Sequence, residues 1–344
     1  MIKLKKLLVG LMVTGMISVL AAGCGQSQTS GTTTTSAKTN KSGSITLYTS
    51  QPETDAQKLI QGFNKEYPDI KVNVFRSGTE QVVSKLLAEK KAGAVQADVL
   101  LVADSVTFES LKEQGMLMSY ASPELKGIPK EYIDKDNMYT GTKVITTGII
   151  YNTNMVKQPL NSYQDLLNSN LKNNIMMPSP LYSGAAAYNI GVIARTNGLG
   201  WGYLKDLKTN GLVVGQGNGT VQKAVVNGEK ACGLIVDYMA VRSKAQGAPV
   251  DFVYPAEGSL SVTEPIGILK TTKNADLAKA FVNFVLSQKG QELAANIGYT
   301  PVKSGVQAPN GLKSIDQIKD LSYDVSVLYK QRDADKAKFS KLMQ

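Results

Sequence analysis

The stretch KVITTGIIY, residues 143–151, decides the fold class of this 344-residue chain. It is almost uncharged and rich in β-branched residues, which is typical of a buried β-strand. Short strands and helices alternate before this stretch, and the same alternation repeats after it. A second extended run, Ser261–Leu269, returns from the repeat. We therefore predict an α/β fold of two lobes, each a mostly parallel sheet flanked by helices, joined by two hinge crossings.

The predicted elements on either side of the crossing define the lobes. Strands are expected at residues 45–49, 70–75 and 98–103 before it, and at 174–177, 212–214 and 231–237 after it. Helices are expected at residues 106–114, 184–196, 220–226, 278–286 and 323–342. The first lobe is predicted to comprise residues 44–147 and 263–344, and the second lobe residues 148–262. About 300 residues are enough for two lobes with their own cores.

The N-terminus has the pattern of an export signal. Lysines at positions 3, 5 and 6 precede an uncharged, mostly apolar run, Leu7–Leu20, which is too short to span a membrane comfortably. Small residues then lead to Cys24, and Leu20–Cys24 resembles a bacterial lipobox, in which the cysteine is lipidated. We expect residues 1–23 to be a removed signal peptide and Cys24 to carry lipid. A plain secretory signal with an incidental cysteine is the alternative.

Residues 24–43 are expected to form a flexible linker. Ser, Thr, Gln, Gly, Asn and Lys make up almost the whole segment after Cys24. Such a composition buries too little apolar surface to fold. Several acyl chains on one cysteine hold a protein durably at a membrane. The expected location is therefore extracytoplasmic, at the extracellular face or in a periplasm, with the protein anchored to the cell membrane.

The absence of histidine restricts the chemistry of the chain more than any other feature of its composition. Histidine is the usual general base and the commonest metal ligand, so Ser-His-Asp enzymes and His-ligated zinc hydrolases are excluded. No Walker or dinucleotide fingerprint is present, and no cofactor is expected. We predict a binding protein rather than an enzyme. A lipoprotein enzyme that uses a Ser-Lys pair or a carboxylate is the alternative class.

Cysteine content and charge narrow the partners. The sequence has two cysteines, and Cys24 is expected to carry lipid, so no disulfide framework is predicted. Cys232 lies in an apolar run and is expected in a buried strand. Loss of the three signal lysines lowers the formal net charge of +10 by three. The Lys and Arg residues are scattered along amphipathic segments and do not interleave with aromatic residues. No nucleic-acid partner is therefore expected, and a basic surface beside an anionic membrane is the default interpretation.

Turns rich in Ser, Thr and Gly follow the carboxyl ends of several predicted strands. Ser50–Glu53 and Ser77–Glu80 fit the capping box, with Ser first and Glu three residues later. Tyr182–Ala185 and Gly217–Thr220 are the corresponding turns of the second lobe. Helix capping alone explains each turn. Together in one crevice, they predict a cradle for an anion, because helix N-termini with free N–H groups favour negative charge.

Four further side chains are candidates for the rest of the site. Asp104 follows the third strand, Asp237 and Tyr238 follow residues 231–236, and Glu264 lies in the return crossing. These side chains are suited to an amine or a hydroxyl; alternatively, Asp104, Asp237 and Tyr238 are oxygen ligands for Fe³⁺. A strand-end cap or a surface charge is the structural alternative for the two aspartates. The predicted ligand-binding residues are Ser50, Ser77, Gly78, Thr79, Asp104, Tyr182, Ser183, Gly184, Ala185, Asn218, Asp237, Tyr238 and Glu264.

An ordered series of short segments also suggests a family. The segments are Tyr48–Ser50, Ala97–Leu101, Gly148–Asn152, Gly228–Leu234, Lys273–Asn274, Ala278–Phe284 and Ser287–Gln291. From Ser44 to about Ser304 the chain resembles the type II periplasmic-binding-protein family, in the branch of ferric-iron, thiamine, phosphonate and hexose-phosphate binders. The resemblance implies a monomer of two lobes that close over a small ligand and dock on an ABC permease in the cytoplasmic membrane.

The resemblance leaves the ligand open. Ferric binders of this branch commonly use an adjacent Tyr-Tyr pair where this chain has Asp237-Tyr238, and some use a histidine, which this chain lacks. Binders of phosphorylated or phosphonylated compounds use Ser/Thr/Gly turns, which this chain keeps. An anionic organic solute is therefore the leading hypothesis, and ferric iron, alone or with an anion, is the alternative.

Overall fold

The computed structural model describes residues 41–344, so the predicted signal peptide and Cys24 lie outside the described residues. Residues Asn40–Gln344 form one compact unit with its own hydrophobic cores. None of the helices within the described range has the length and apolar character needed to cross a membrane.

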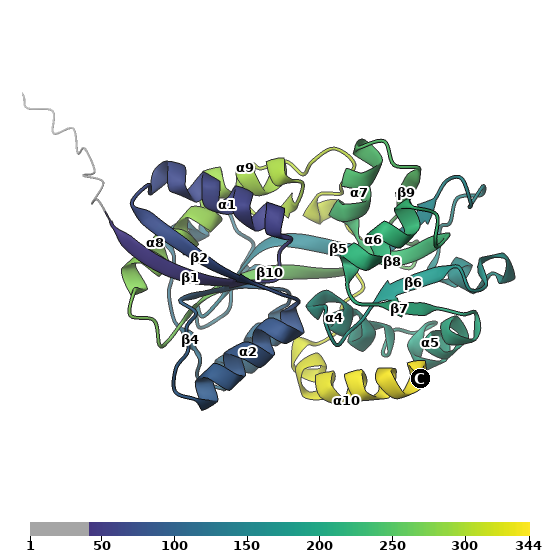
Figure 1. The fold of residues 1–344 in the computed structure, drawn as a ribbon, viewed down its shortest axis with the longest axis horizontal. Helices are drawn as coiled ribbons and strands as arrows, with labels where there is room; N and C mark the ends of the chain where they lie inside the picture. The colour runs from purple at the N-terminus through teal and green to yellow at the C-terminus, as the bar shows by residue number, and fades with distance from the viewer. Residues whose placement is uncertain (1–40) are drawn as a thin grey trace, which may run out of the picture. The chain divides into compact units, whose positions relative to one another are not determined.

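The chain alternates strands and helices, as Figure 1 shows. The strands are β1 (Gly43–Thr49), β2 (Ile70–Arg76), β3 (Val99–Leu101), β4 (Leu117–Met118), β5 (Thr140–Asn152), β6 (Ile175–Pro178), β7 (Val213–Gly215), β8 (Cys232–Val236), β9 (Val250–Val253), β10 (Leu260–Leu269) and β11 (Thr300–Pro301). The helices are α1 (Glu53–Glu66), α2 (Thr79–Lys91), α3 (Ser105–Glu113), α4 (Gly184–Ile193), α5 (Gly200–Thr209), α6 (Asn218–Val226), α7 (Asp237–Ala245), α8 (Ala275–Leu286), α9 (Gln288–Ile297) and α10 (Val325–Met343).

The sheet order confirms the predicted two-lobed α/β fold. The strands follow the order β2-β1-β3-β10-β5-β8-β6-β7. Pairing is parallel within β2-β1-β3 and within β8-β6-β7, and antiparallel where β10 and β5 join these groups. We call the part around β1–β3 the first lobe and the part around β6–β8 the second lobe. The two long strands between them are the two predicted crossings.

The crossing strands are buried because both of their faces are covered. All thirteen residues of β5 are buried, which explains its nearly uncharged sequence. In β10 the register with β5 shifts between Thr263 and Pro265. Pro265 has no N–H to donate to the hydrogen-bond ladder. A register shift of this kind changes the direction of the side chain within it, which is that of Glu264.

The hydrophobic cores follow the alternation of the strands. Ile45 and Leu47 of β1 belong to one core of the first lobe, whereas Tyr48 belongs to a second core on the other face of the sheet. The second lobe has one large core around β6, β8 and α4, and α4 is buried along its whole length. This large core also includes Ala103 and Val106 of the first lobe, so it extends across the boundary between the lobes.

The C-terminal helix α10 contacts both lobes. It packs against α3 of the first lobe and against α4 and α5 of the second, and it lies beside α4 and α5 in Figure 1. The sequence predicted this helix, but the predicted lobe boundaries place all of residues 263–344 in the first lobe. With α10 against both lobes, the exact boundaries stay a prediction.

Candidate functional site

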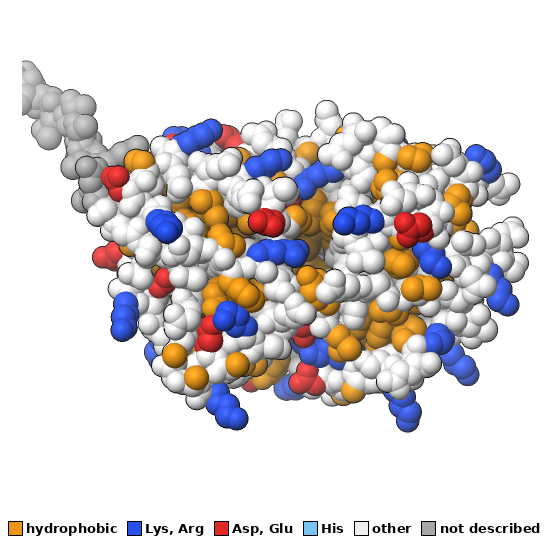
Figure 2. Space-filling model, viewed as in Figure 1, with side chains coloured by type: hydrophobic (Ala, Val, Ile, Leu, Met, Phe, Trp, Pro, Cys, Tyr) orange, Lys and Arg blue, Asp and Glu red, His pale blue; other side chains and the backbone are white. Residues whose placement is uncertain are grey.

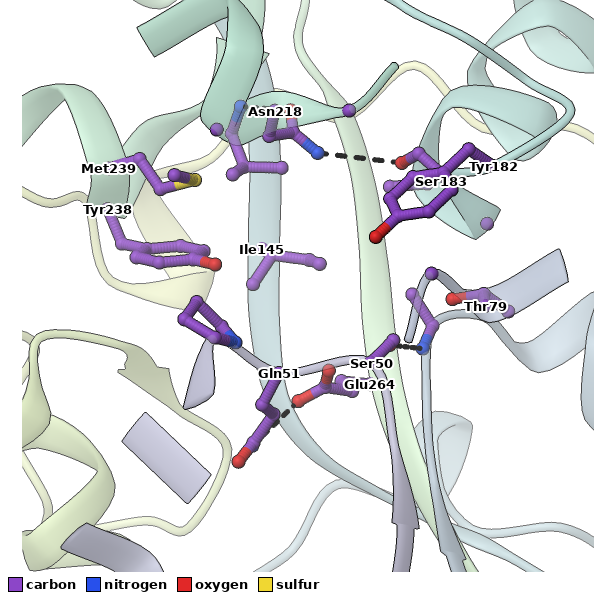
Figure 3. A pocket seen from close by; sticks show the side chains of 18 of the residues that line it. Ser50, Gln51, Thr79, Ile145, Tyr182, Ser183, Asn218, Tyr238, Met239 and Glu264 are labelled. Carbon is purple, nitrogen blue, oxygen red and sulfur yellow. Dashed lines mark hydrogen bonds between the residues drawn. The ribbon is translucent and has the colours of Figure 1, made fainter. Parts of the chain in front are cut away.

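A cavity of about 390 Å³ lies where helix N-termini of both lobes meet the crossing strands. Its wall includes residues at the starts of α1 and α2 from the first lobe, and at the starts of α4 and α6 from the second. Ile145 of β5 and Glu264 of β10 complete the wall. Figure 3 shows these side chains converging on one space, with Ile145 in the middle and Glu264 below it. The cavity size is within the usual range for a small-molecule site.

The structure brings most of the predicted ligand-binding residues to this wall. They are Ser50, Gly78, Thr79, Tyr182, Ser183, Gly184, Ala185, Asn218, Tyr238 and Glu264. The other three, Ser77, Asp104 and Asp237, are not among the lining residues.

Each of these three side chains has a partner elsewhere. Ser77 Oγ donates to Gln81 on the surface. Asp104 caps α3 by accepting from Thr107 N at 2.9 Å, and it forms a salt bridge with Arg332 at 3.1 Å. Neither side chain is at the cavity wall, because Gln81 binds Ser77, and Thr107 and Arg332 hold Asp104; their part in ligand binding stays a prediction.

Asp237 is held by the protein rather than offered to the cavity. Its carboxylate accepts from the backbone N–H groups of Thr146 and Tyr238 and from the hydroxyl of Tyr254, at 3.2, 2.8 and 3.1 Å. The residue is 1% exposed. Burial raises its pKa to about 6, and the hydrogen bonds oppose part of this shift.

The helix N-termini on the wall have free donors. The predicted capping boxes are absent, because the N-cap of α1 is Pro52 and the N-cap of α2 is Gly78, and neither side chain caps its helix. Gly217 at the start of α6 likewise supplies no side-chain cap. Only α4 is capped, by Ser183 Oγ, which accepts from Ala186 N at 3.3 Å. In α2 the Glu80 N–H donates to Tyr182 O at 3.3 Å, whereas the N–H groups of Thr79 in α2 and of Asn218 and Gly219 in α6 have no partner within residues 41–344 and are available for a ligand.

Asn218 and Ser183 approach each other across the top of the cavity. Asn218 Nδ2 lies 3.5 Å from Ser183 Oγ, the dashed contact in Figure 3, and its Oδ1 accepts from Val236 N at 3.3 Å. The second contact fixes the amide orientation, so that the NH₂ group points toward the cavity.

Two cations on the wall were missed from the sequence. Arg76 ends β2, and Lys223 lies within α6. Neither forms a salt bridge within residues 41–344, although Arg76 Nε donates to Gln51 O at 2.8 Å. No local motif marks them, since only the fold brings a strand end of one lobe opposite a helix of the other. In contrast, Figure 2 shows Lys and Arg spread singly over the outer face in view.

The lower wall holds a neutralised carboxylate. Glu264 is paired with Lys143, both almost fully buried, and Gln51 Nε2 donates to Glu264 at 2.9 Å. A buried ion pair of this kind requires further hydrogen bonds to offset desolvation. Because Lys143 balances the charge of Glu264, the cavity wall carries a positive excess from Arg76 and Lys223.

Tyr238 and Tyr299 form the side of the cavity opposite Thr79. The rings of Tyr238 and Tyr299 lie 4.4 Å apart, and Arg242 stacks on both. Burial first, and then the nearby Glu264, raises the pKa of Tyr238, so its phenol stays protonated at neutral pH and acts as a hydrogen-bond donor. Within the described residues, no group of three or more His, Cys, Asp or Glu side chains gathers to hold a metal ion.

Close interlobe approaches surround the cavity. A Cβ atom on Gly184 of the second lobe would lie 2.4 Å from Ala103 O and 2.8 Å from Thr79 Cγ2 of the first. A Cβ atom on Gly78 would lie 2.5 Å from Tyr182 O. Asp55 of α1 forms a salt bridge with Arg242 of α7 at 2.9 Å. The structure is therefore a closed arrangement of the two lobes.

A ligand-sized cavity closed between two α/β lobes on two crossing strands defines a two-lobed solute-binding protein. The chain belongs to the bacterial extracellular solute-binding protein family, whose profile matches residues 58–319.

Proteins that resemble this chain are named for different ligands. The chain is 26% identical to Iron uptake protein A1 of Synechocystis sp., over 88% of this chain and 87% of that protein. It is 25% identical to a putative 2-aminoethylphosphonate-binding periplasmic protein of Salmonella typhimurium, over 69% and 71%. The solved structure of the periplasmic binding protein AfuA from Actinobacillus pleuropneumoniae, with fructose-6-phosphate bound, matches with a TM-score of 0.80 and 26% identity, covering 87% of this chain and 98% of that one.

Proposed function

We propose that this solute-binding protein of an ABC importer captures a small anionic organic solute, such as a phosphate ester or a phosphonate, in the cavity between its lobes. The observation that carries the proposal is the uncapped N-termini of α2 and α6 on one cavity wall with the unpaired cations Arg76 and Lys223. Free backbone N–H groups at helix starts and cationic side chains are the donors that phosphate and phosphonate groups bind.

The remaining wall fits the organic part of such a solute. Gln51, Tyr238 and Glu264 present an amide, a phenol and a neutralised carboxylate to the same space, and these groups suit hydroxyl or amine substituents. The fructose-6-phosphate in the related AfuA structure and the phosphonate named for the Salmonella relative support this ligand class.

A ligand panel tests the proposal. The chain from Asn40 onward is heated with fructose 6-phosphate, 2-aminoethylphosphonate, ferric citrate or 1,4-diaminobutane. A millimolar ligand that binds with micromolar affinity adds about 4 kcal/mol of stability and raises the melting temperature. We expect stabilisation by a phosphorylated or phosphonylated compound and a colourless protein.

Two variants identify the cavity as the site. Arg76→Gln and Lys223→Gln should each weaken the anion about tenfold, because each loses a charged contact. Lys205→Gln, an exposed α5 lysine outside the cavity lining, is the matched control and should bind as the wild type does. A coloured protein stabilised by ferric ion alone would establish the iron alternative instead.

We further propose that lipid on Cys24 holds the protein at the membrane. The support is the signal pattern before Cys24 and the family of extracellular binding proteins to which the chain belongs. Cys24→Ser should move the protein from the membrane fraction to the soluble fraction, whereas Cys232→Ser should leave it in the membrane fraction. Equal fractionation of Cys24→Ser and the wild type would contradict the anchor.

A further inference from the structure

A second cavity of about 700 Å³ lies on the opposite face of the crossing strands. Ile145 and Glu264 border the first cavity, whereas their neighbours Val144 and Thr263 border the second. Successive side chains of a strand point to opposite faces, so the two cavities are separated by β5 and β10. The outer wall of the second cavity is formed by α3, by residues 131–135, and by the segment that leads into α10.

The charge of the second cavity is opposite to that of the first. Lys135 is the one cationic side chain among its lining residues. Five carboxylates border it: Glu109, Glu113, Glu131, Asp134 and Asp320. Lys112 neutralises Asp134. Glu131 has no hydrogen-bond or salt-bridge partner within the described residues. Burial raises the pKa of Asp320. The cavity therefore retains a negative excess in a chain that is basic overall.

Tyrosine side chains supply the rest of the polar wall. Tyr132, Tyr139 and Tyr329 border the cavity together with Tyr188. Burial first, and then the carboxylates around the cavity, raises the pKa of Tyr132 and of Tyr139. Neutral aromatic faces beside carboxylates attract organic cations.

Tyr188 of α4 is an independent sign that the cavity takes a ligand. The residue is 6% exposed, and it borders this cavity rather than the first. Its hydroxyl has no hydrogen-bond partner within residues 41–344, and because it is not one of the fully buried unpaired polar atoms of this range, it is open to the cavity that Tyr188 borders. A ligand ammonium group would satisfy the hydroxyl oxygen, which can accept a hydrogen bond.

The arrangement favours an extended cation over a metal ion. The carboxylates come from α3, from residues 131–134 and from Asp320, and no three of them gather closely enough in the described structure to hold a metal. We propose that this cavity is a second binding site, specific for an organic cation with two ammonium groups, which the carboxylates and the Tyr188 hydroxyl bind at separate points of the wall. The site is independent of the anion proposed for the first cavity.

Calorimetric titration at low ionic strength tests the second site, with 1,4-diaminobutane, butylamine and MgCl₂ as probes and with the chain from Asn40 onward. We expect one diamine per chain, bound more tightly than butylamine. Glu131→Gln should weaken the diamine about tenfold, and Tyr188→Phe about fivefold, because each removes one contact to an ammonium group. Asp206→Asn removes an exposed carboxylate of α5 outside both cavities and should leave the affinity unchanged.

Three results would overturn the proposal. The first is the absence of binding at millimolar diamine. The second is displacement of the diamine by MgCl₂ at constant ionic strength, which would indicate unspecific attraction to negative charge. The third is diamine binding that is lost in Tyr238→Phe but kept in Glu131→Gln, which would place the amine in the first cavity. Circular dichroism of each variant separates loss of binding from loss of fold.

Discussion

Asp237 makes the free energy of unfolding depend on pH. Its folded pKa of about 6 exceeds the unfolded value of about 3.9, so the folded state binds the proton more tightly. A carboxyl group with a raised folded pKa favours the folded state most below pH 4. That contribution falls as the pH rises through 6 and then stays constant.

We predict that Asp237→Asn flattens this dependence. The stability of the wild type relative to the variant should fall by about 2 kcal/mol between pH 4 and pH 7, because the two pKa values differ by about two units and the unfolded group is already half ionised at pH 4. Urea unfolding at both pH values measures the difference. The control Asp206→Asn removes an exposed carboxylate, and its free energy of unfolding should depend on pH as that of the wild type does. If Asp237→Asn also showed the pH dependence of the wild type, the raised pKa would be incorrect.

Asp237 also shows how far residue-level prediction extends. The sequence predicted Asp237 as a ligand-binding residue, with a strand-end cap or a surface charge as the alternative, but it could not show which groups the carboxylate would bind within the protein. Its partners Thr146 and Tyr254 are distant in the chain. Ser183, Gly184 and Asn218 were found because turn chemistry is local, whereas Arg76 and Lys223 reach the cavity only through the packing of two lobes.

The crossing strands and most helices were predicted from the sequence, and three helices were not. The first-lobe strands and α8 were found from their apolar periodicity. Helices α5, α7 and α9 were missed: α7 has almost no amphipathic pattern, and α9 follows α8 after the single residue Ser287. Helix α10 was predicted, but its contacts with both lobes depend on side chains far away in the sequence.

Arg332 and Lys336 attach α10 to the first lobe through salt bridges. Arg332 is 11% exposed at its side chain and bonds to Asp104 at 3.1 Å and to Glu80 at 2.7 Å. Burial opposes the ionised form of Glu80, but Arg332 and Lys336 hold its pKa below the usual value. Removal of Arg332 would leave the fully buried Asp104 without its cation.

We therefore expect Arg332→Met to destabilise the fold by about 3 kcal/mol, the cost of breaking a buried pair on one side. Lys330→Met, at an exposed position of the same helix, should change stability by less than about 0.5 kcal/mol. Denaturant unfolding of the two variants compares these costs directly. An equal effect of both substitutions would mean that the ion pairs of Arg332 do not stabilise the contact between α10 and the first lobe.

Closure of the cavity depends on how closely the two lobes approach each other. Gly184 begins α4 in the second lobe, and the first-lobe backbone at Ala103 O leaves no room for a Cβ atom there. Gly219 lies at the start of α6 on the same cavity wall, but a Cβ atom added to it would meet no other atom within 4 Å. Both residues lie in the first turn of a helix, where alanine is favourable to the fold itself.

We expect Gly184→Ala to hold the lobes apart without unfolding them. A contact at 2.4 Å from a backbone oxygen must be relieved by movement of one lobe, and overpacking of this kind costs about 1–3 kcal/mol. The variant should therefore bind the anion at least about tenfold more weakly, while its melting temperature without ligand stays unchanged. Small-angle scattering should show a decrease in radius of gyration on ligand addition for the wild type and Gly219→Ala, but not for Gly184→Ala. If Gly184→Ala compacted and bound like the wild type, the close approach of Gly184 to Ala103 O would not limit closure of the lobes.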